Sequence, residues 1–103
     1  MQIRQTNHEF NFGSYPTFGH NIDPKQRAWI EVRGKALETN VRHLRSKLSK
    51  NCQFMAVVKA DGYGHDAKVV SEYAIRGGAS QLGVATLKEG LKLRSSGVKK
   101  PIL

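Results

Sequence analysis

An uninterrupted apolar run from Phe54 to Val58 constrains the fold of this chain more than any other feature. A run of this kind is typical of a strand buried on both faces, as in a parallel sheet covered by helices. The residues after it predict a helix over 66–77, a strand over 82–85, a helix over 87–96 and the start of a strand at 101–103. Because strands and helices alternate over short connections, we expect a parallel α/β sheet with right-handed crossovers.

Specific capping residues set the bounds of the two predicted helices. Asp66 can accept hydrogen bonds from the first amides of one helix, and Gly77-Gly78 can end it because glycine tolerates positive φ. Thr86 and Glu89 have the spacing of a capping box at the start of the other, which Gly97 ends. The apolar pattern predicts an inner face at Ala67, Val70 and Ala74 in the first helix, and one shared face for Leu87, Leu91 and Arg94 in the second.

The N-terminal residues differ in composition from the rest of the chain. Residues 1–26 are polar, rich in Asn and Gly, and carry aromatic residues without a steady helical or strand period. From Ala28 an alternating pattern predicts a strand, and apolar residues at helical spacing predict an amphipathic helix over 36–48. We therefore expect a flexible extension over 1–26 and a folded segment over 27–103.

The predicted sheet lacks covering elements beyond its third strand. A parallel sheet is buried on both faces and has its edges covered, yet the sequence ends at Leu103 as that strand begins. We therefore interpret the chain as the opening segment of a larger α/β fold. A complete small α/β domain is the alternative.

The chain is strongly basic, with a formal net charge of +9 from 17 Lys and Arg against 8 Asp and Glu. A basic surface attracts phosphate on nucleic acids, membranes or cofactors. The basic residues are nevertheless scattered through helix-like segments, and no nucleic-acid-binding signature accompanies them. We expect no nucleic-acid partner, and we ascribe the excess charge to acidic partners encoded elsewhere in a longer protein.

Other features of the composition bear on the compartment and on metal binding. Cys52 is the single cysteine, so no intrachain disulfide can form and a reducing compartment is expected. No apolar stretch approaches the length of a membrane span, and the N-terminus lacks the order of a signal peptide. His43 lies on the polar face of a predicted helix, so we expect it to be solvated, and we expect no metal site. These features predict a cytoplasmic protein without a membrane partner.

Lys59 directly follows the apolar run, at the carboxyl end of the predicted strand. In parallel α/β proteins this end carries the residues that perform chemistry. An amine that emerges from an apolar wall loses hydration, which disfavours its charged form, and a neutral amine can form a Schiff base with an aldehyde. Gly62 and Gly64 would let the backbone turn tightly after the lysine. A solvated lysine before an ordinary strand-to-helix turn is the alternative.

The run Val58-Lys59-Ala60-Asp61-Gly62-Tyr63-Gly64-His65 resembles the pyridoxal-phosphate attachment signature of the alanine racemase family. The match covers consecutive positions and departs at Asp66, where the family pattern has glycine. The similarity extends over residues 28–103, from Ala28-Trp29-Ile30-Glu31-Val32 to Pro101-Ile102-Leu103. Only the N-terminal extension lies outside it.

The resemblance implies the N-terminal segment of a (β/α)8 TIM-like barrel, incomplete in this chain, in an enzyme that interconverts L-alanine and D-alanine for peptidoglycan. It implies pyridoxal 5'-phosphate as the cofactor, bound to Lys59 as an aldimine. Once substrate frees Lys59, the lysine would serve as one of two bases that move the α proton of the amino acid. It also implies that Tyr63 contacts the cofactor phosphate and that the full-length protein is a homodimer. The second base, a tyrosine from the partner subunit, would lie beyond Leu103, so we expect no useful turnover from this chain alone.

Three other functions stay open on these residues. A broad-specificity amino-acid racemase would carry a near-identical signature, although such relatives are typically exported. A non-catalytic pyridoxal-phosphate-binding remnant would keep Lys59 and lack the second base. A basic nucleic-acid-binding module would bind arbitrary strands with an affinity that falls steeply with salt.

Overall fold

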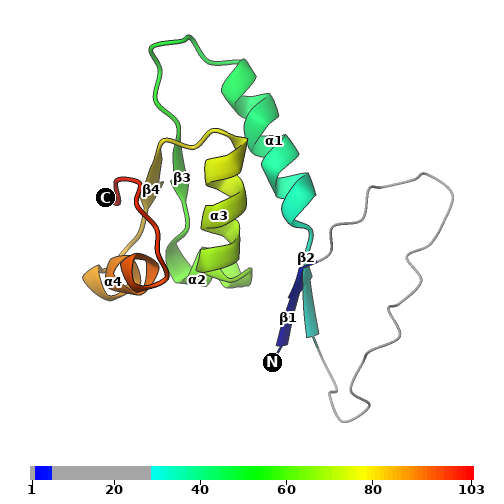
Figure 1. Ribbon diagram of the computed structural model, residues 1–103, viewed down its shortest axis with the longest axis vertical. Coiled ribbons are helices and arrows are strands. Elements are labelled where there is room, and N and C mark those ends of the chain that lie inside the picture. Colours follow the sequence, from blue (N-terminus) through cyan, green and yellow to red (C-terminus); the bar gives the residue numbers. More distant parts are fainter. Residues whose placement is uncertain (1, 6–28) are drawn as a thin grey trace, which may run out of the picture.

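The computed structural model describes residues 2–5 and 29–103 (Figure 1). Strand β1 (Gln2–Gln5) pairs in parallel with β2 (Trp29–Val32), which confirms a strand after residue 28. β1 belongs to the segment in which we expected no regular structure, and it gains its order from backbone pairing with a strand far along the chain. The rest of that segment lies outside the described residues, so its boundary at residue 26 stays a prediction.

A second parallel pair carries the candidate site. β3 (Met55–Val57) and β4 (Gln81–Gly83) pair with Met55 opposite Gln81. The C-terminal residues lie beside β4 in the same direction, since Leu82 bridges to Ile102 and the amide of Leu103 donates a hydrogen bond to the carbonyl of Leu82 at 2.9 Å. The predicted parallel arrangement of three strand segments is therefore confirmed.

Helices α1 (Gly34–Ser46) and α3 (Ala67–Gly77) pack side by side, next to the β3–β4 pair (Figure 1). α1 begins at Gly34, two residues before the predicted start. A Cβ atom at Gly34 would lie 2.1 Å from the ring of Tyr73, so glycine is required for this approach of the two helices. None of the helices in the described part of the chain is long and apolar enough to cross a membrane.

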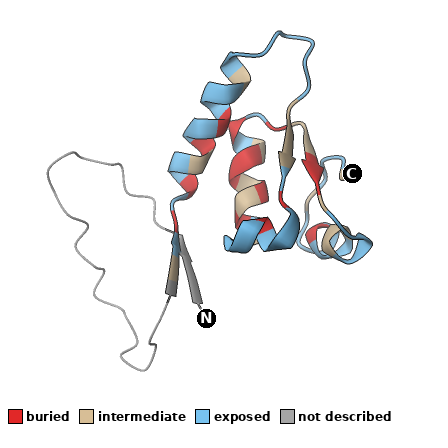
Figure 2. Cartoon of the chain, turned by 180° about the vertical axis from the view of Figure 1, so that it is seen from behind, coloured by how far each residue is buried: buried red, intermediate tan, exposed pale blue. Residues whose placement is uncertain are grey.

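The core lies between α3, the strands and α4 (Leu87–Ser95). Val58, Leu82 and Leu93 are at most 2% exposed, and Figure 2 shows buried residues concentrated on α3 and along β4. Val57 is 50% exposed, so the expectation that this strand is buried on both faces is wrong for the described residues. Ala56 packs against the core, whereas the neighbouring Val57 stays half exposed.

The capping residues act as predicted, and α4 buries a face other than the one that Leu87 shares with Leu91. Thr86 and Glu89 form the capping box at the start of α4, which confirms the predicted start. Leu87 and Leu91 are 80% and 59% exposed, so the face that they share is not the buried one. Leu93, which the spacing did not single out, fills the core instead.

Candidate functional site

Lys59 follows the buried residue Val58, just after β3, and opens a short helical segment, α2 (Lys59–Gly64). The preceding residue, Val58, is 1% exposed, and its amide donates a hydrogen bond to the carbonyl of Gly83 at 2.8 Å. This bond anchors the backbone at the carboxyl end of the sheet, next to the lysine. Lys59 itself is exposed, so the described residues do not supply the loss of hydration that we expected for its amine.

The backbone after Lys59 turns with left-handed helical geometry. Ala60, Asp61, Gly62 and Tyr63 have φ angles of 51°, 54°, 65° and 54°. The amide of Gly62 donates a hydrogen bond to the carbonyl of Val58 at 2.9 Å, which closes the turn. Left-handed geometry costs roughly 1–2 kcal/mol for each residue with a Cβ atom. The turn therefore persists only because surrounding contacts compensate for this cost.

Two carboxylates supply such contacts. Glu89 Oε1 accepts a hydrogen bond from the amide of Ala60 at 2.8 Å. Asp61 Oδ1 accepts one from the amide of Ala67 at 3.2 Å, and it lies 3.4 Å from Lys92 Nζ. The turn is thereby tied to the start of α3 and to α4.

The two glycines of the turn differ in their surroundings. A Cβ atom at Gly62 would lie 3.0 Å from Cγ2 of Val70 and 3.2 Å from the backbone of Ala67. A Cβ atom at Gly64, where φ is 80°, would meet nothing within 4 Å. Gly62 therefore provides space as well as conformational freedom, whereas Gly64 provides conformational freedom alone.

Asp66 combines positive φ with a helix cap. Its φ is 68°, in the region that favours glycine, which is the residue of the family pattern at this position. Its Oδ1 accepts hydrogen bonds from the amides of Lys68 at 2.9 Å and Val69 at 3.2 Å, which confirms the predicted N-cap of α3. The cap offsets the strain that aspartate introduces there.

Tyr63 stands on the same turn as Lys59 and is 58% exposed. The turn thus presents an amine and a phenol to solvent from one short stretch of backbone. His65 Nδ1 lies 2.9 Å from the carbonyl of Tyr63 and 3.2 Å from that of Gly62. His65 therefore contacts the backbone of the turn itself and can orient it.

Glu89 is the site residue that sequence reasoning missed, because its spacing indicated only a helix cap. Its Oε2 accepts hydrogen bonds from the amides of Ala85 at 2.9 Å and Thr86 at 3.2 Å, while Oε1 reaches Ala60. The amides of Ala85 and Ala60 stabilise the ionised form and lower the pKa of Glu89 below its ordinary value. No local pattern predicts the bond to Ala60, which lies 29 positions earlier in the chain.

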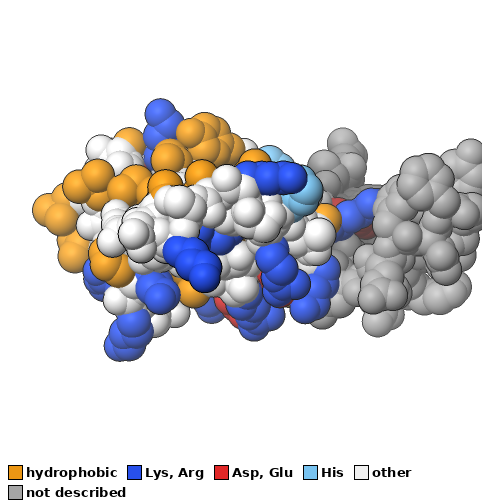
Figure 3. Space-filling model, turned by 90° about the horizontal axis from the view of Figure 1, so that it is seen from above, with side chains coloured by type: hydrophobic (Ala, Val, Ile, Leu, Met, Phe, Trp, Pro, Cys, Tyr) orange, Lys and Arg blue, Asp and Glu red, His pale blue; other side chains and the backbone are white. Residues whose placement is uncertain are grey.

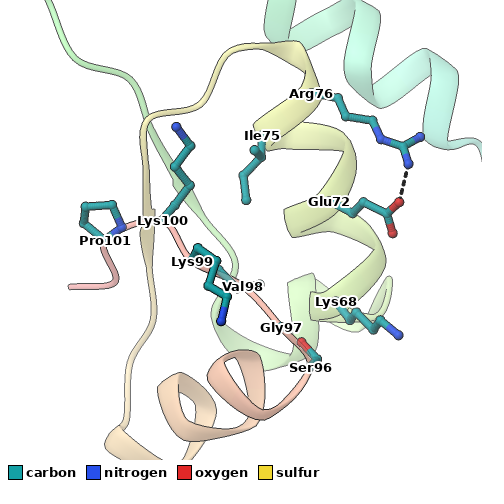
Figure 4. A pocket seen from close by; sticks show the side chains of 10 residues that line it. All are labelled: Lys68, Glu72, Ile75, Arg76, Ser96, Gly97, Val98, Lys99, Lys100 and Pro101. Atoms are coloured by element: carbon teal, nitrogen blue, oxygen red, sulfur yellow. Dashed lines mark hydrogen bonds and ion pairs between the residues drawn. The ribbon is translucent and has the colours of Figure 1, made fainter.

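A cavity of about 660 Å³ lies between α3 and the segment that follows α4 (Figure 4). Its walls include the ion pair of Glu72 with Arg76, and Lys100 from the connection to the last strand segment. Neither Lys59 nor Tyr63 lines it. The candidate site is therefore the exposed turn after β3, not this cavity.

On the one face that Figure 3 shows, the charged side chains do not gather at one place. On the face shown in Figure 3, Lys and Arg side chains form separate groups among hydrophobic and uncharged ones. Within residues 2–5 and 29–103, no group of three or more His, Cys, Asp or Glu side chains could hold a metal ion.

Comparison with known proteins identifies relatives of the segment that holds the turn. Residues 32–103 match the family model of the alanine racemase N-terminal domain. The alanine racemase of Prochlorococcus marinus is 55% identical over 82% of this chain and 22% of that protein. The alanine racemase of Nostoc sp. is 54% identical over 76% of this chain and 20% of that protein.

Solved structures agree with the sequence matches. The alanine racemase from E. faecalis superposes with a TM-score of 0.68 at 39% identity, over 69% of this chain and 19% of that chain. That from Bacillus anthracis, with bound L-Ala-P, gives a TM-score of 0.66 at 39% identity, over 67% of this chain and 18% of that chain. This chain thus spans about a fifth of the length of the relatives that it matches.

Proposed function

The chain belongs to the alanine racemase family, and on that premise we propose that it carries the cofactor lysine and a phosphate-contacting tyrosine of an alanine racemase. The predicted fold, the N-terminal part of the barrel of these enzymes, is confirmed by the matched structures. Because the chain spans about a fifth of its relatives, racemisation is proposed for a protein that also holds the remaining elements.

The residues of the turn fit pyridoxal phosphate, on which this family generally depends. An amine can bind the cofactor aldehyde, and a phenol hydroxyl can donate a hydrogen bond to a phosphate oxygen. Lys59 and Tyr63 offer these two groups in exposed positions on one braced stretch of backbone. We assign Lys59 as the residue that holds the cofactor and Tyr63 as a phosphate contact.

When bound, pyridoxal phosphate supplies an electron sink that makes the α proton of an amino acid removable. Lys59 Nζ can accept that proton on one face of the substrate or return it there. Racemisation also needs a base on the opposite face. We propose a tyrosine from the partner subunit of a homodimer for that role.

Substrate and compartment are proposed on the same premise. The relatives named above are alanine racemases, which supports alanine as the substrate and a role in supplying D-alanine for peptidoglycan. The single cysteine, Cys52, is exposed and free, which suits a reducing compartment and supports a cytoplasmic location.

The exposed amine of Lys59 at the anchored end of β3 is the observation that carries this proposal. To test it, the full-length gene product is incubated with pyridoxal phosphate and reduced with borohydride. The modified lysines are then mapped by peptide mass spectrometry. We expect modification at Lys59 to exceed that at Lys68, an exposed lysine of α3. Lys59→Ala should abolish the visible absorbance of bound cofactor, and Lys68→Ala should retain it. Equal modification of the two lysines would contradict the assignment.

Addition of alanine then separates a racemase from a non-catalytic binder. A racemase should change its cofactor absorbance with either enantiomer and form D-alanine from L-alanine in a coupled assay. Bound cofactor that responds to neither enantiomer would identify a non-catalytic remnant. Comparable rates with several amino acids would identify a broad-specificity racemase.

A further inference from the structure

We propose that Glu89 is a positioning residue for Lys59, because its carboxylate holds the amide of Ala60 and thereby fixes the turn on which the lysine stands. The inference rests on the proposed function of Lys59 as the cofactor lysine. It assigns to Glu89 a role beyond the capping of α4.

One side chain joins the ends of two neighbouring parallel strands. Glu89 Oε2 accepts hydrogen bonds from the amides of Ala85 and Thr86, just after β4, while Oε1 accepts one from Ala60, just after β3. Figure 1 shows that α2 and α4 lie at the same end of the β3–β4 pair. The carboxylate thus connects the loop that begins α4 to the backbone beside Lys59.

The amide of Ala60 is part of the peptide unit that begins at Lys59. Because a peptide unit is planar, a hydrogen bond that holds this amide also holds the carbonyl of Lys59 and limits rotation about its backbone. Ala60 has a φ of 51°, so this peptide unit stands at the start of the strained turn. Without an acceptor, the amide would lose a bond to a charged group, which is about twice as strong as a neutral one.

The charge of Glu89 suits this role. The hydrogen bonds from Ala85 and Ala60 lower the pKa of its carboxyl, so both oxygens act only as acceptors at neutral pH. Three amide donors meet these two oxygens, so a side chain with a single acceptor oxygen cannot satisfy all of them.

Matched variants separate positioning from helix capping. Glu89→Ala removes the bond to Ala60 and the capping box together. Thr86→Ala removes the contacts of the Thr86 side chain with Glu89, among them the bond between Thr86 Oγ1 and the amide of Glu89, and leaves the carboxylate in contact with Ala60. Glu89→Gln keeps the shape of the side chain but has one acceptor oxygen in place of two. This variant replaces Glu89→Ala in the test if the alanine variant does not fold.

The test uses the full-length gene product and its variants. In each protein, it compares the rates at which pyridoxal phosphate and borohydride modify Lys59 and Lys68. We expect both Glu89 variants to lower the ratio of these rates roughly tenfold, because each weakens or removes a hydrogen bond to a charged acceptor. Thr86→Ala should leave the ratio within about twofold of the unmodified chain, because the bond to Ala60 persists. Hydrogen exchange at the amide of Ala60 should accelerate only in the Glu89 variants.

The outcomes distinguish this inference from the proposed function. If the unmodified chain labels Lys59 no faster than Lys68, the proposed function fails. If the unmodified chain prefers Lys59 and a folded Glu89 variant keeps both that preference and slow exchange at Ala60, only the positioning role is overturned.

Discussion

A Cβ atom at Gly77 would lie 2.7 Å from the backbone carbonyl oxygen of Glu38, so α3 and α1 meet here almost backbone to backbone. The same atom would also lie 2.7 Å from Cβ of Val41. Val41 packs with Ala74 and with Ala56 of β3 in a core cluster. The distance between the two helices is thus coupled to the position of the strand that leads to the site.

Gly77→Ala should destabilise the fold by about 1–3 kcal/mol, because the added methyl group would force the two helices apart. Gly90→Ala is the matched control in α4, where the new Cβ would lie 3.7 Å from Ile102 and Val84. That substitution should stabilise by up to about 1 kcal/mol, since alanine favours a helix. Urea unfolding of both variants measures the difference, and equal stabilities would argue against the close contact of α1 with α3.

Leu93→Ala and Leu91→Ala test which face of α4 is buried. Leu93 is 2% exposed, so its truncation should cost about 2–5 kcal/mol in the free energy of unfolding. Leu91 is 59% exposed, and its truncation should stay within about 0.5 kcal/mol. The reverse order in urea unfolding would show that α4 is rotated about its axis.

The sequence predicted the order of elements and their caps because these depend on neighbouring residues. The apolar run before Lys59 indicated a strand, and Asp66 and Thr86 indicated helix starts through side chains that bond amides two or three residues away. Such signals involve residues close together in the chain, so a single sequence is enough to detect them. They also sufficed to place Lys59 at the carboxyl end of a parallel strand.

The features that escaped prediction depend on residues far apart in the chain. β1 becomes a strand only by pairing with β2, and Leu93 is buried by elements that precede α4. The left-handed turn at Ala60 persists although alanine disfavours it, because Glu89 offers an acceptor from a later element. Local propensity predicts the opposite backbone geometry there.

Asp66→Gly and Asp66→Ala should change the free energy of unfolding by different amounts. Glycine loses the cap of α3, which costs a few tenths of a kcal/mol, but relieves the strain of a φ of 68°. Alanine loses the cap and keeps the strain, so it should cost about 0.5–2 kcal/mol. Thermal unfolding should therefore rank the glycine variant above the alanine variant. If alanine proves as stable as glycine, positive φ at this position is not maintained in solution.

Acid should remove the contribution of Glu89 to folding stability. Hydrogen bonds from the amides of Ala85 and Ala60 lower the pKa of Glu89 in the folded chain below its ordinary value of 4.5. As pH falls, the unfolded chain therefore takes up this proton before the folded chain does, and stability increases with pH across the interval between the two values. The contribution is complete above that ordinary value and is lost as pH falls through the folded pKa.

Urea unfolding of the unmodified chain and of Glu89→Gln, from about pH 7 to about pH 3, measures this contribution. Glutamine does not titrate, so the difference between the two free energies of unfolding should be constant near neutral pH and shrink in acid. The pKa of Glu38 is also lowered, first by its hydrogen bond with Lys35, but Glu38 is present in both proteins and its titration cancels in the difference. A difference that stays constant down to the lowest pH would mean that the carboxylate of Glu89 gains nothing from these amides.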